Sequence, residues 1–178
     1  EPVGITIPEA GFLDGVRELT HKAGALLVFD EIVNGFRMGF AGGGASQGVT
    51  PDLGCFGKAM ANGAPLSAVV GRRDVMNVFD EIFFSGTFGG DTCALAACKA
   101  TIGELERLDV FAHLQSYGAR LSNAIQEMIS SHGLNGALDL VGYPERSILT
   151  FPHSDEYQSR LRRSYFMQEC HKRGLLFF

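Results

Sequence analysis

The chain has 178 residues, of which 46% are hydrophobic and 20% are charged, and its formal net charge at pH 7 is −5. These values describe a globular chain long enough for one sizeable core, and no apolar run approaches the roughly 20 residues of a bilayer-spanning helix. No charged start followed by an apolar stretch resembles a signal peptide, so we expect a cytoplasmic protein without a membrane span.

Helices and short strands alternate in the first part of the sequence. Apolar residues at helical spacing predict a helix over residues 11–23 that ends at Gly24, and a buried strand follows at 25–30. The glycine-rich stretch over 35–48 holds too few large apolar residues for a core element, so we expect a loop there. The next predicted elements are short: strands over 53–56, 66–70 and 83–84, and a helix over 74–79.

Longer helices and a hairpin follow. A small-residue helix is expected to begin at an N-cap formed by Asp91 or Thr92, and a long amphipathic helix to end before Gly133. The predicted elements of this part are helices over 92–108, 109–131 and 156–173, a strand pair over 138–142 and 148–151, and a strand over 175–178.

Basic and sulfur-containing side chains give no sign of nucleic-acid or metal binding. The densest basic group, Arg160, Arg162 and Arg163, is predicted to be a solvated helix face, because Asp155 and Glu156 lie nearby. The four cysteines form no C-x-x-C pair, and the histidines form no H-E-x-x-H motif. We therefore expect reduced thiols, no disulfide and no metal site.

The order of the elements predicts an α/β fold. Strands that alternate with helices up to about residue 108 favour a mainly parallel sheet covered on both faces, and the part after Gly133 resembles the start of a smaller α+β domain. We expect residues 1–133 to belong to a large domain and 134–178 to begin a small C-terminal domain. The start at Glu1 without Met and the apolar final residues suggest a piece of a longer protein.

Two adjacent carboxylates, Asp30 and Glu31, end the first apolar strand. They are solvated surface acids in one interpretation, which is the usual fate of such residues. In the other, one of them lies at the carboxyl end of a parallel strand, where open α/β sheets bind ligands. A positively charged partner would favour the second interpretation.

Lys58 is the candidate for that partner. It follows the predicted strand over 53–56 and a glycine, and its apolar neighbours suggest a partly buried amine of the kind that forms Schiff bases. A lysine that reaches solvent from a strand end is the alternative. Pyridoxal phosphate needs both a lysine and a carboxylate at its pyridine nitrogen, so Asp30 and Lys58 facing one cleft would suit this cofactor.

Two other motifs name different enzyme classes. The stretch GASQG matches a nucleophile elbow around Ser46, but the elbow needs a strand before it, and loop is expected there. The stretch FGKAM lacks the glycine of a nucleotide-binding P-loop, because Asp52 stands at that position. A serine hydrolase is therefore a minor alternative, and a P-loop protein is excluded.

Three stretches together resemble one family. DEIVNGFR at 30–37, TPDLGCFGKAMANGAPLSAVVGRRDVM at 50–76 and SGTFGG at 85–90 are similar to the class III (ω-type) aminotransferases, in particular to the branch that contains glutamate-1-semialdehyde aminomutase. The resemblance implies a pyridoxal-phosphate-dependent transferase of fold type I. It also implies a homodimer whose active sites are shared between the subunits.

The resemblance assigns roles to individual residues. Asp30 corresponds to the partner of the pyridinium nitrogen, and Lys58 to the lysine that forms the aldimine with pyridoxal 5'-phosphate and moves the substrate proton. Ile32 would pack on one face of the cofactor ring. Thr87 would reach from the partner subunit to the cofactor phosphate, and Gly86 would let the backbone come close.

Other positions depart from the family pattern or stay open. Asn34 stands where the family often has Thr, and Gly90-Asp91-Thr92 replaces the usual Asn-Pro. Whether Glu31 touches the cofactor or supports a loop stays open, and Arg37 is equally open. The family's phosphate-cradling loop and substrate-carboxylate contacts lie outside this sequence.

The expected activity is therefore amino-group transfer between an amine or amino acid and a keto or aldehyde acceptor. An aminomutase, which uses the same residues within one substrate molecule, is the alternative. A cofactor-free binding or dimerisation role is the remote one.

Overall fold

The structure is a computed structural model that describes residues 5–176. It divides into two compact units, one of residues 8–114 and one that joins residues 5–7 to 115–176. Helix α5 (Val110–Ser131) begins in the first unit and ends in the second. The domain boundary expected near residue 133 falls just after this helix and stays a prediction for the whole protein.

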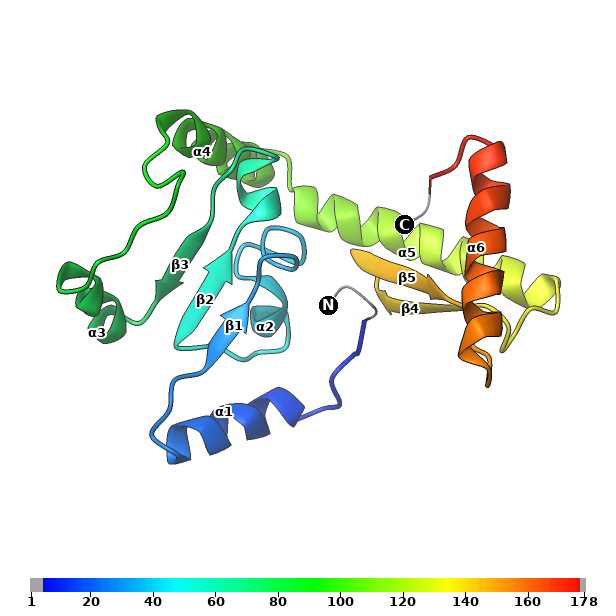
Figure 1. The fold of residues 1–178 in the computed structure, drawn as a ribbon, viewed down its shortest axis with the longest axis horizontal. Helices are drawn as coiled ribbons and strands as arrows, with labels where there is room; N and C mark the ends of the chain where they lie inside the picture. Colours follow the sequence, from blue (N-terminus) through cyan, green and yellow to red (C-terminus); the bar gives the residue numbers. More distant parts are fainter. Residues whose placement is uncertain (1–4, 177–178) are drawn as a thin grey trace. The chain divides into compact units, whose positions relative to one another are not determined.

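A three-stranded sheet lies at the centre of the unit of residues 8–114 (Figure 1). Its strands are β1 (Val28–Asp30), β2 (Leu53–Phe56) and β3 (Ala68–Gly71). β1 pairs with β2 in parallel, whereas β2 pairs with β3 antiparallel. The expectation of a mainly parallel sheet thus holds for the first pairing only. The reason is the connection from β2 to β3, which is too short for a crossover helix.

Helices follow the strands of this unit much as the sequence predicts. α1 (Phe12–Lys22) precedes β1, and the short α3 (Arg73–Met76) and η2 (Asn77–Asp80) follow β3. The N-cap of α4 (Thr92–Arg107) is Asp91, whose carboxylate accepts a 2.7 Å hydrogen bond from the Ala94 N–H. This cap stands where the family pattern has Asn-Pro. The other bounds are α2 (Gly42–Ser46) and η1 (Lys58–Ala61).

The second unit contains the predicted hairpin. β4 (Asp139–Tyr143) and β5 (Arg146–Thr150) pair antiparallel, and α6 (Glu156–Lys172) follows. A Cβ atom at Gly118 of α5 would lie 1.9 Å from the Pro144 carbonyl oxygen, so only glycine lets the helix approach the hairpin turn this closely. An apolar groove with a volume of about 160 Å³ lies between side chains of α5, the hairpin and α6.

Two predicted strands are wrong where the structure describes them. Phe83 and Phe84 form no strand, and their side chains are 93% and 68% exposed. Their apolar character favours a strand locally, but a strand needs a neighbour to pair with, and none of the described segments offers one. Leu175 and Leu176 are likewise outside any strand, and the rest of that prediction, at 177–178, lies outside the described residues.

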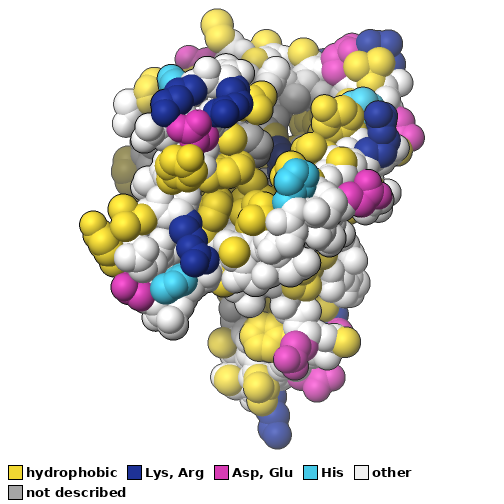
Figure 2. Space-filling view, turned by 90° about the vertical axis from the view of Figure 1, so that its right-hand side faces the viewer, with side chains coloured by type: hydrophobic (Ala, Val, Ile, Leu, Met, Phe, Trp, Pro, Cys, Tyr) yellow, Lys and Arg dark blue, Asp and Glu magenta, His cyan; other side chains and the backbone are white. Residues whose placement is uncertain are grey.

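The basic residues of α6 lie on an exposed face, as predicted. Arg160 pairs with Glu156, and Arg162 donates to the Pro152 carbonyl oxygen. On the side of the molecule that Figure 2 shows, Lys and Arg side chains lie among acidic and hydrophobic ones. Over residues 5–176, no helix combines the length and the apolar character needed to cross a membrane.

Asp52 fixes the amino end of the sheet. Its side chain is 3% exposed and accepts hydrogen bonds from the Leu27 N–H at 2.7 Å and from Arg72 Nη1 at 2.8 Å, while His21 Nε2 lies 2.9 Å away. The Arg72 guanidinium, followed by the Leu27 N–H and His21, holds the pKa of the Asp52 carboxyl far below its usual range. One carboxylate therefore ties α1, the start of β1 and the end of β3 to β2.

This arrangement predicts a stability loss in acid. Because the folded-state pKa of Asp52 is lowered, its contribution is present above about pH 4 and is lost as the pH falls below that value. Asp52→Asn in the full-length protein should lower Tm at pH 7 on the order of 5 °C and flatten the fall of Tm between about pH 5 and pH 3.

The control for this prediction is Asp14→Asn, which removes an exposed pair with Arg17. Its Tm should stay within about 1 °C of wild type at each pH, because exposed ion pairs contribute little. A Tm that falls as steeply with acid in Asp52→Asn as in wild type would contradict the assignment. Thermal unfolding followed by circular dichroism measures both.

Candidate active site

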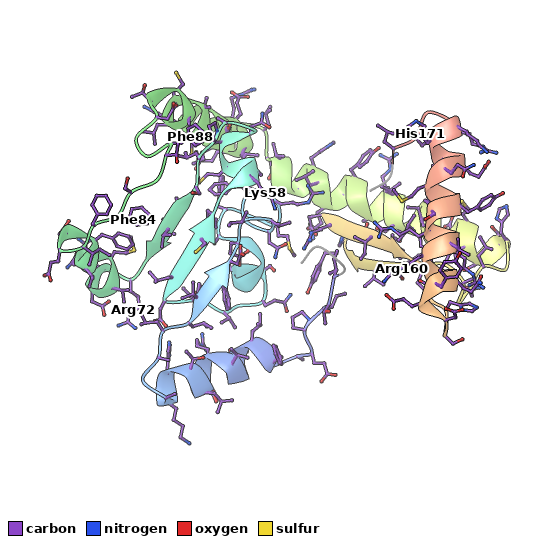
Figure 3. All side chains as sticks on the ribbon, in the orientation of Figure 1. Lys58, Arg72, Phe84, Phe88, Arg160 and His171 are labelled. Carbon is purple, nitrogen blue, oxygen red and sulfur yellow. The ribbon has the colours of Figure 1, made fainter. Side chains whose placement is uncertain are left out.

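The parallel pairing of β1 with β2 brings two predicted site residues to one edge of the sheet. Asp30, the last residue of β1, pairs with Cys55 of β2, and Lys58 follows Cys55 by three positions. Both residues therefore lie at the carboxyl ends of parallel strands. In Figure 3, Lys58 and Arg72 are seen toward opposite ends of the sheet.

Asp30 presents a largely unused carboxylate at this edge. The residue is exposed, and its Oδ1 accepts a 3.0 Å hydrogen bond from the Ile32 N–H. Within residues 5–176, no other hydrogen bond or ion pair involves this carboxylate. One oxygen is therefore oriented by the backbone, and the other is available to a donor from outside the chain.

Lys58 has an unusual backbone conformation. Its φ of +44° lies in the left-handed region, which costs a residue with a side chain about 1–3 kcal/mol. Such strain persists where the surroundings fix it, and it occurs often at ligand sites. The prediction of a partly buried amine at Lys58 is wrong in this structure, because the residue is exposed at the start of η1.

Ile32 lies beside the turn that carries the lysine. It is half-buried, and its Cγ2 atom is 3.7 Å from the position that a Cβ atom on Gly57 would occupy. The side chain thus packs against the residue directly before Lys58. Asp30, Ile32 and Lys58 thus lie at one edge of the sheet, and the roles expected of them stay predictions.

Thr87 and Gly86 lie elsewhere in the same unit. They belong to an exposed turn between η2 and α4, in which the Gly89 N–H donates to the Gly86 carbonyl oxygen at 2.9 Å. Figure 3 labels Phe84 and Phe88 in this connection. Among the described residues, no hydrogen bond joins Thr87 to Asp30 or Lys58, and the role expected of Thr87 stays a prediction.

The structure gives Glu31 a supporting contact. Its side chain is 3% exposed, and its two carboxylate oxygens accept hydrogen bonds from the Gly43 and Gly44 N–H groups, each at 2.8 Å. These donors lie in the first turn of α2. Local sequence patterns do not predict this contact, because it joins positions twelve and thirteen residues apart.

The glycine-rich stretch over 35–48 is a packed segment rather than a plain loop. A Cβ atom at Gly42 would lie 2.1 Å from Glu31 Oε2, and one at Gly44 would lie 2.2 Å from Phe29 Cε2. These close approaches explain why the segment contains α2 and buried glycines although it lacks large apolar residues. The glycine spacing was the only sign of this packing in the sequence.

The alternative sites receive no support from the geometry. Ser46 ends α2, and its hydroxyl donates a 2.7 Å hydrogen bond to the Gly43 carbonyl oxygen. No strand directly precedes it, so the nucleophile elbow lacks its structural context. In the part of the chain that the structure describes, no group of three or more His, Cys, Asp or Glu side chains could hold a metal ion.

Comparison with known proteins identifies the family. Residues 2–139 match the family described as aminotransferase class-III. The chain belongs to this family. Class-III aminotransferases use pyridoxal phosphate, and the α/β fold of this chain is that of the pyridoxal-phosphate-dependent transaminases of fold type I.

Similar proteins carry more than one enzyme name. A glutamate-1-semialdehyde 2,1-aminomutase of Thermomicrobium roseum is 38% identical over 149 residues, which cover 80% of this chain and 35% of that protein. A 3-aminobutyryl-CoA aminotransferase of Cloacimonas acidaminovorans is 34% identical over 178 residues, covering 94% of this chain and 42% of that protein. The chain thus spans about a third to two fifths of the length of these relatives.

Solved structures agree in fold. The pyridoxal-phosphate internal aldimine form of the FumI protein of Sphingopyxis sp. MTA144 superposes with a TM-score of 0.85 at 26% identity, over 98% of this chain and 41% of that one. The class-III aminotransferases and aminomutases among the relatives are pyridoxal-phosphate-dependent enzymes.

The packing around Glu31 predicts unequal effects of two glycine substitutions. Gly42 and Gly48 have similar backbone angles, φ +81° and φ +76°, but only a side chain at Gly42 meets Glu31, whereas Gly48 faces open space. Both substitutions to Ala carry the cost of the left-handed conformation, and Gly42→Ala also displaces the buried carboxylate.

Gly42→Ala should therefore lower the free energy of unfolding by about 2–4 kcal/mol more than Gly48→Ala. Urea denaturation of the two variants and of wild type in the full-length protein measures this difference. Equal losses in the two variants would show that the segment is not packed as described.

Proposed function

We propose that this chain is the lysine-bearing part of a pyridoxal-phosphate-dependent aminotransferase. The observation that carries the proposal is the register of β1 and β2, which sets Asp30 and Lys58 at the same edge of a parallel strand pair. Membership of the class-III family supports it. The residues also fit the cofactor, because a carboxylate with an unused oxygen and an exposed amine are the two groups that its ring and aldehyde require.

Each residue has a distinct role in this proposal. Lys58 would hold the cofactor through its amine and, once the incoming substrate amine has displaced it, would act as general base and acid toward the substrate Cα proton. Asp30 keeps the pyridine nitrogen protonated, while the Ile32 N–H orients the carboxylate at 3.0 Å. Ile32 would provide apolar contact to the cofactor ring. When bound, pyridoxal phosphate supplies the electron sink for the reaction.

The substrates are an amine or amino acid and a keto or aldehyde acceptor. A specific observation supports the aminomutase alternative: several relatives bear the name glutamate-1-semialdehyde 2,1-aminomutase. The alternatives differ in one requirement, since a transaminase needs an external amino acceptor whereas an aminomutase does not. Product formation from a single substrate without added keto acid would replace the first proposal by the second.

We further propose a homodimer with shared active sites. The segment between η2 and α4 is exposed throughout and carries the large apolar side chains Ile82, Phe83, Phe84 and Phe88. Covering such a patch with a second copy would remove apolar surface from water and bring Thr87 and Gly86 toward the partner's cofactor phosphate. We also propose that the protein is located in a reducing compartment such as the cytoplasm, because its four cysteines are free thiols.

Reduction with borohydride tests the lysine directly. The full-length protein loaded with pyridoxal phosphate should give a pyridoxyl adduct on the peptide that contains Lys58. Lys58→Ala should lose the adduct, whereas Lys99→Ala, an exposed lysine on α4, should keep it. Peptide mass spectrometry reads the result, and a folded wild-type protein without an adduct would favour the cofactor-free alternative.

Asp30→Asn separates cofactor attachment from catalysis. The amide cannot hold the pyridinium charge, so the variant should keep the Lys58 adduct but lose activity on the order of 100-fold or more. Glu9→Gln, at an exposed carboxylate near the start of α1, serves as the control and should retain wild-type turnover. Steady-state kinetics with saturating cofactor measure both, and full activity in Asp30→Asn would remove Asp30 from the site.

A subunit-mixing experiment tests the shared site. Lys58→Ala and Thr87→Ala dimers should each be weakly active alone, because every site lacks one group. In a mixed dimer, one site combines the intact Lys58 of one subunit with the intact Thr87 of the other, so random 1:1 mixing should restore about a quarter of the wild-type activity. Absence of restoration after verified subunit exchange would show that Thr87 does not serve the partner's site.

A further inference from the structure

Glu31 is a buried carboxylate that the proposed chemistry does not use. The two buried charged side chains in the described structure are Glu31 and Asp52, each 3% exposed. Asp52 has Arg72 as a cationic partner, whereas within residues 5–176 Glu31 has hydrogen bonds from backbone N–H groups and no ion pair. A buried anion without a cation is costly, so these two hydrogen bonds must hold it.

The backbone of Glu31 is fixed on both sides. Its N–H donates to the Cys55 carbonyl oxygen at 2.9 Å, which extends the β1–β2 ladder by one position, and its carbonyl oxygen accepts from the Gly35 N–H at 2.7 Å. Successive side chains of an extended segment point in opposite directions. Asp30 is accordingly exposed at the strand edge, while Glu31 turns inward to Gly43 and Gly44.

The segment that Glu31 holds also reaches the lysine turn. Phe36 follows the Gly35 turn, has φ +58°, and packs edge-on against Phe56 with ring centroids 5.8 Å apart. A bulky residue at positive φ is strained and needs external support. Phe56 in turn ends β2, directly before Gly57 and Lys58. The segment that Glu31 holds is therefore connected to Asp30 at the end of β1 and, through the contact between Phe36 and Phe56, to the turn that carries Lys58.

We propose that Glu31 is a positioning residue for the cofactor site. Its carboxylate clamps the first turn of α2 to the end of β1, and this clamp fixes the geometry of Asp30 and, through Phe36 and Phe56, of Lys58. The inference rests on the proposed function, because the geometry matters only for a group bound between Asp30 and Lys58. It assigns the two adjacent carboxylates different tasks, one toward the cofactor and one toward the scaffold.

Glu31→Gln is the decisive substitution. Glutamine has nearly the same shape but only one acceptor oxygen, so its NH2 group faces one of the two glycine N–H donors. In the full-length protein, hydrogen exchange at the Gly43 and Gly44 amides should speed up on the order of 10-fold, and the apparent Kd for pyridoxal phosphate should rise on the order of 10-fold. The Lys58 adduct should still form at saturating cofactor.

Two further variants make the result decisive. Glu106→Gln, at an exposed carboxylate on α4, should leave both measurements at wild-type values. Glu31→Asp keeps the charge with a shorter reach and should shift both measurements in the same direction as glutamine by a smaller factor. It also serves as the test variant if Glu31→Gln does not fold.

The outcomes separate this inference from the function beneath it. Faster exchange together with weaker cofactor binding supports a positioning role. Faster exchange with unchanged cofactor binding makes Glu31 a structural residue only and overturns the proposal, as does unchanged exchange. If wild type itself forms no pyridoxyl adduct, the proposed function fails, and the positioning role falls with it, although the exchange result still tests the clamp.

Discussion

The parallel pairing of β1 with β2 is the constraint on which the rest of the unit of residues 8–114 depends. The register that aligns Val28 with Leu53 and Asp30 with Cys55 decides where every later residue of both strands lies. A slip of one position would turn Asp30 inward and Glu31 outward, because side chains alternate along a strand. The candidate site is therefore a property of the register more than of any single side chain.

Two buried carboxylates hold this register from opposite ends. At the amino end, Asp52 accepts from the Leu27 N–H, which ties β2 to the start of β1, and pairs with the Arg72 guanidinium, which ties β2 to the end of β3. At the carboxyl end, Glu31 binds two neutral backbone N–H groups instead. Within residues 5–176, the charge of Glu31 is therefore held by backbone dipoles, whereas that of Asp52 is paired with a guanidinium.

Local signals account for the parts that the sequence predicted well. β2 was predicted with its observed bounds, and α1, α4 and the β4–β5 hairpin closely, because periodicity, the Asp91 cap and turn residues act within a few positions. The contacts of Asp52 and of Glu31 join residues that are far apart along the chain, so local sequence patterns do not predict them. The strand predicted at Phe83 and Phe84 is wrong because its local signal is sufficient but no described segment pairs with it.

For the candidate site, the sequence predicted where the residues lie but not their exposure or backbone conformation. The positions of Asp30 and Lys58 at one edge follow from two strands that end at known residues, and this expectation is met. The exposure of Lys58 and its positive φ were not predictable, because both depend on how the turn after β2 is packed. The roles of Ile32, Thr87 and Gly86 came from family resemblance and stay predictions.

The close approach of glycines to larger side chains also restricts how this sequence can diverge. Gly42 faces Glu31, Gly44 faces Phe29, and a Cβ atom at Gly35 would lie 2.5 Å from Phe56 Cδ1. In each pair, the space is shared, so a side chain can appear at the glycine only after its neighbour has become smaller or has moved. Homologous proteins should therefore change these positions in pairs and in a fixed order, with the large partner first.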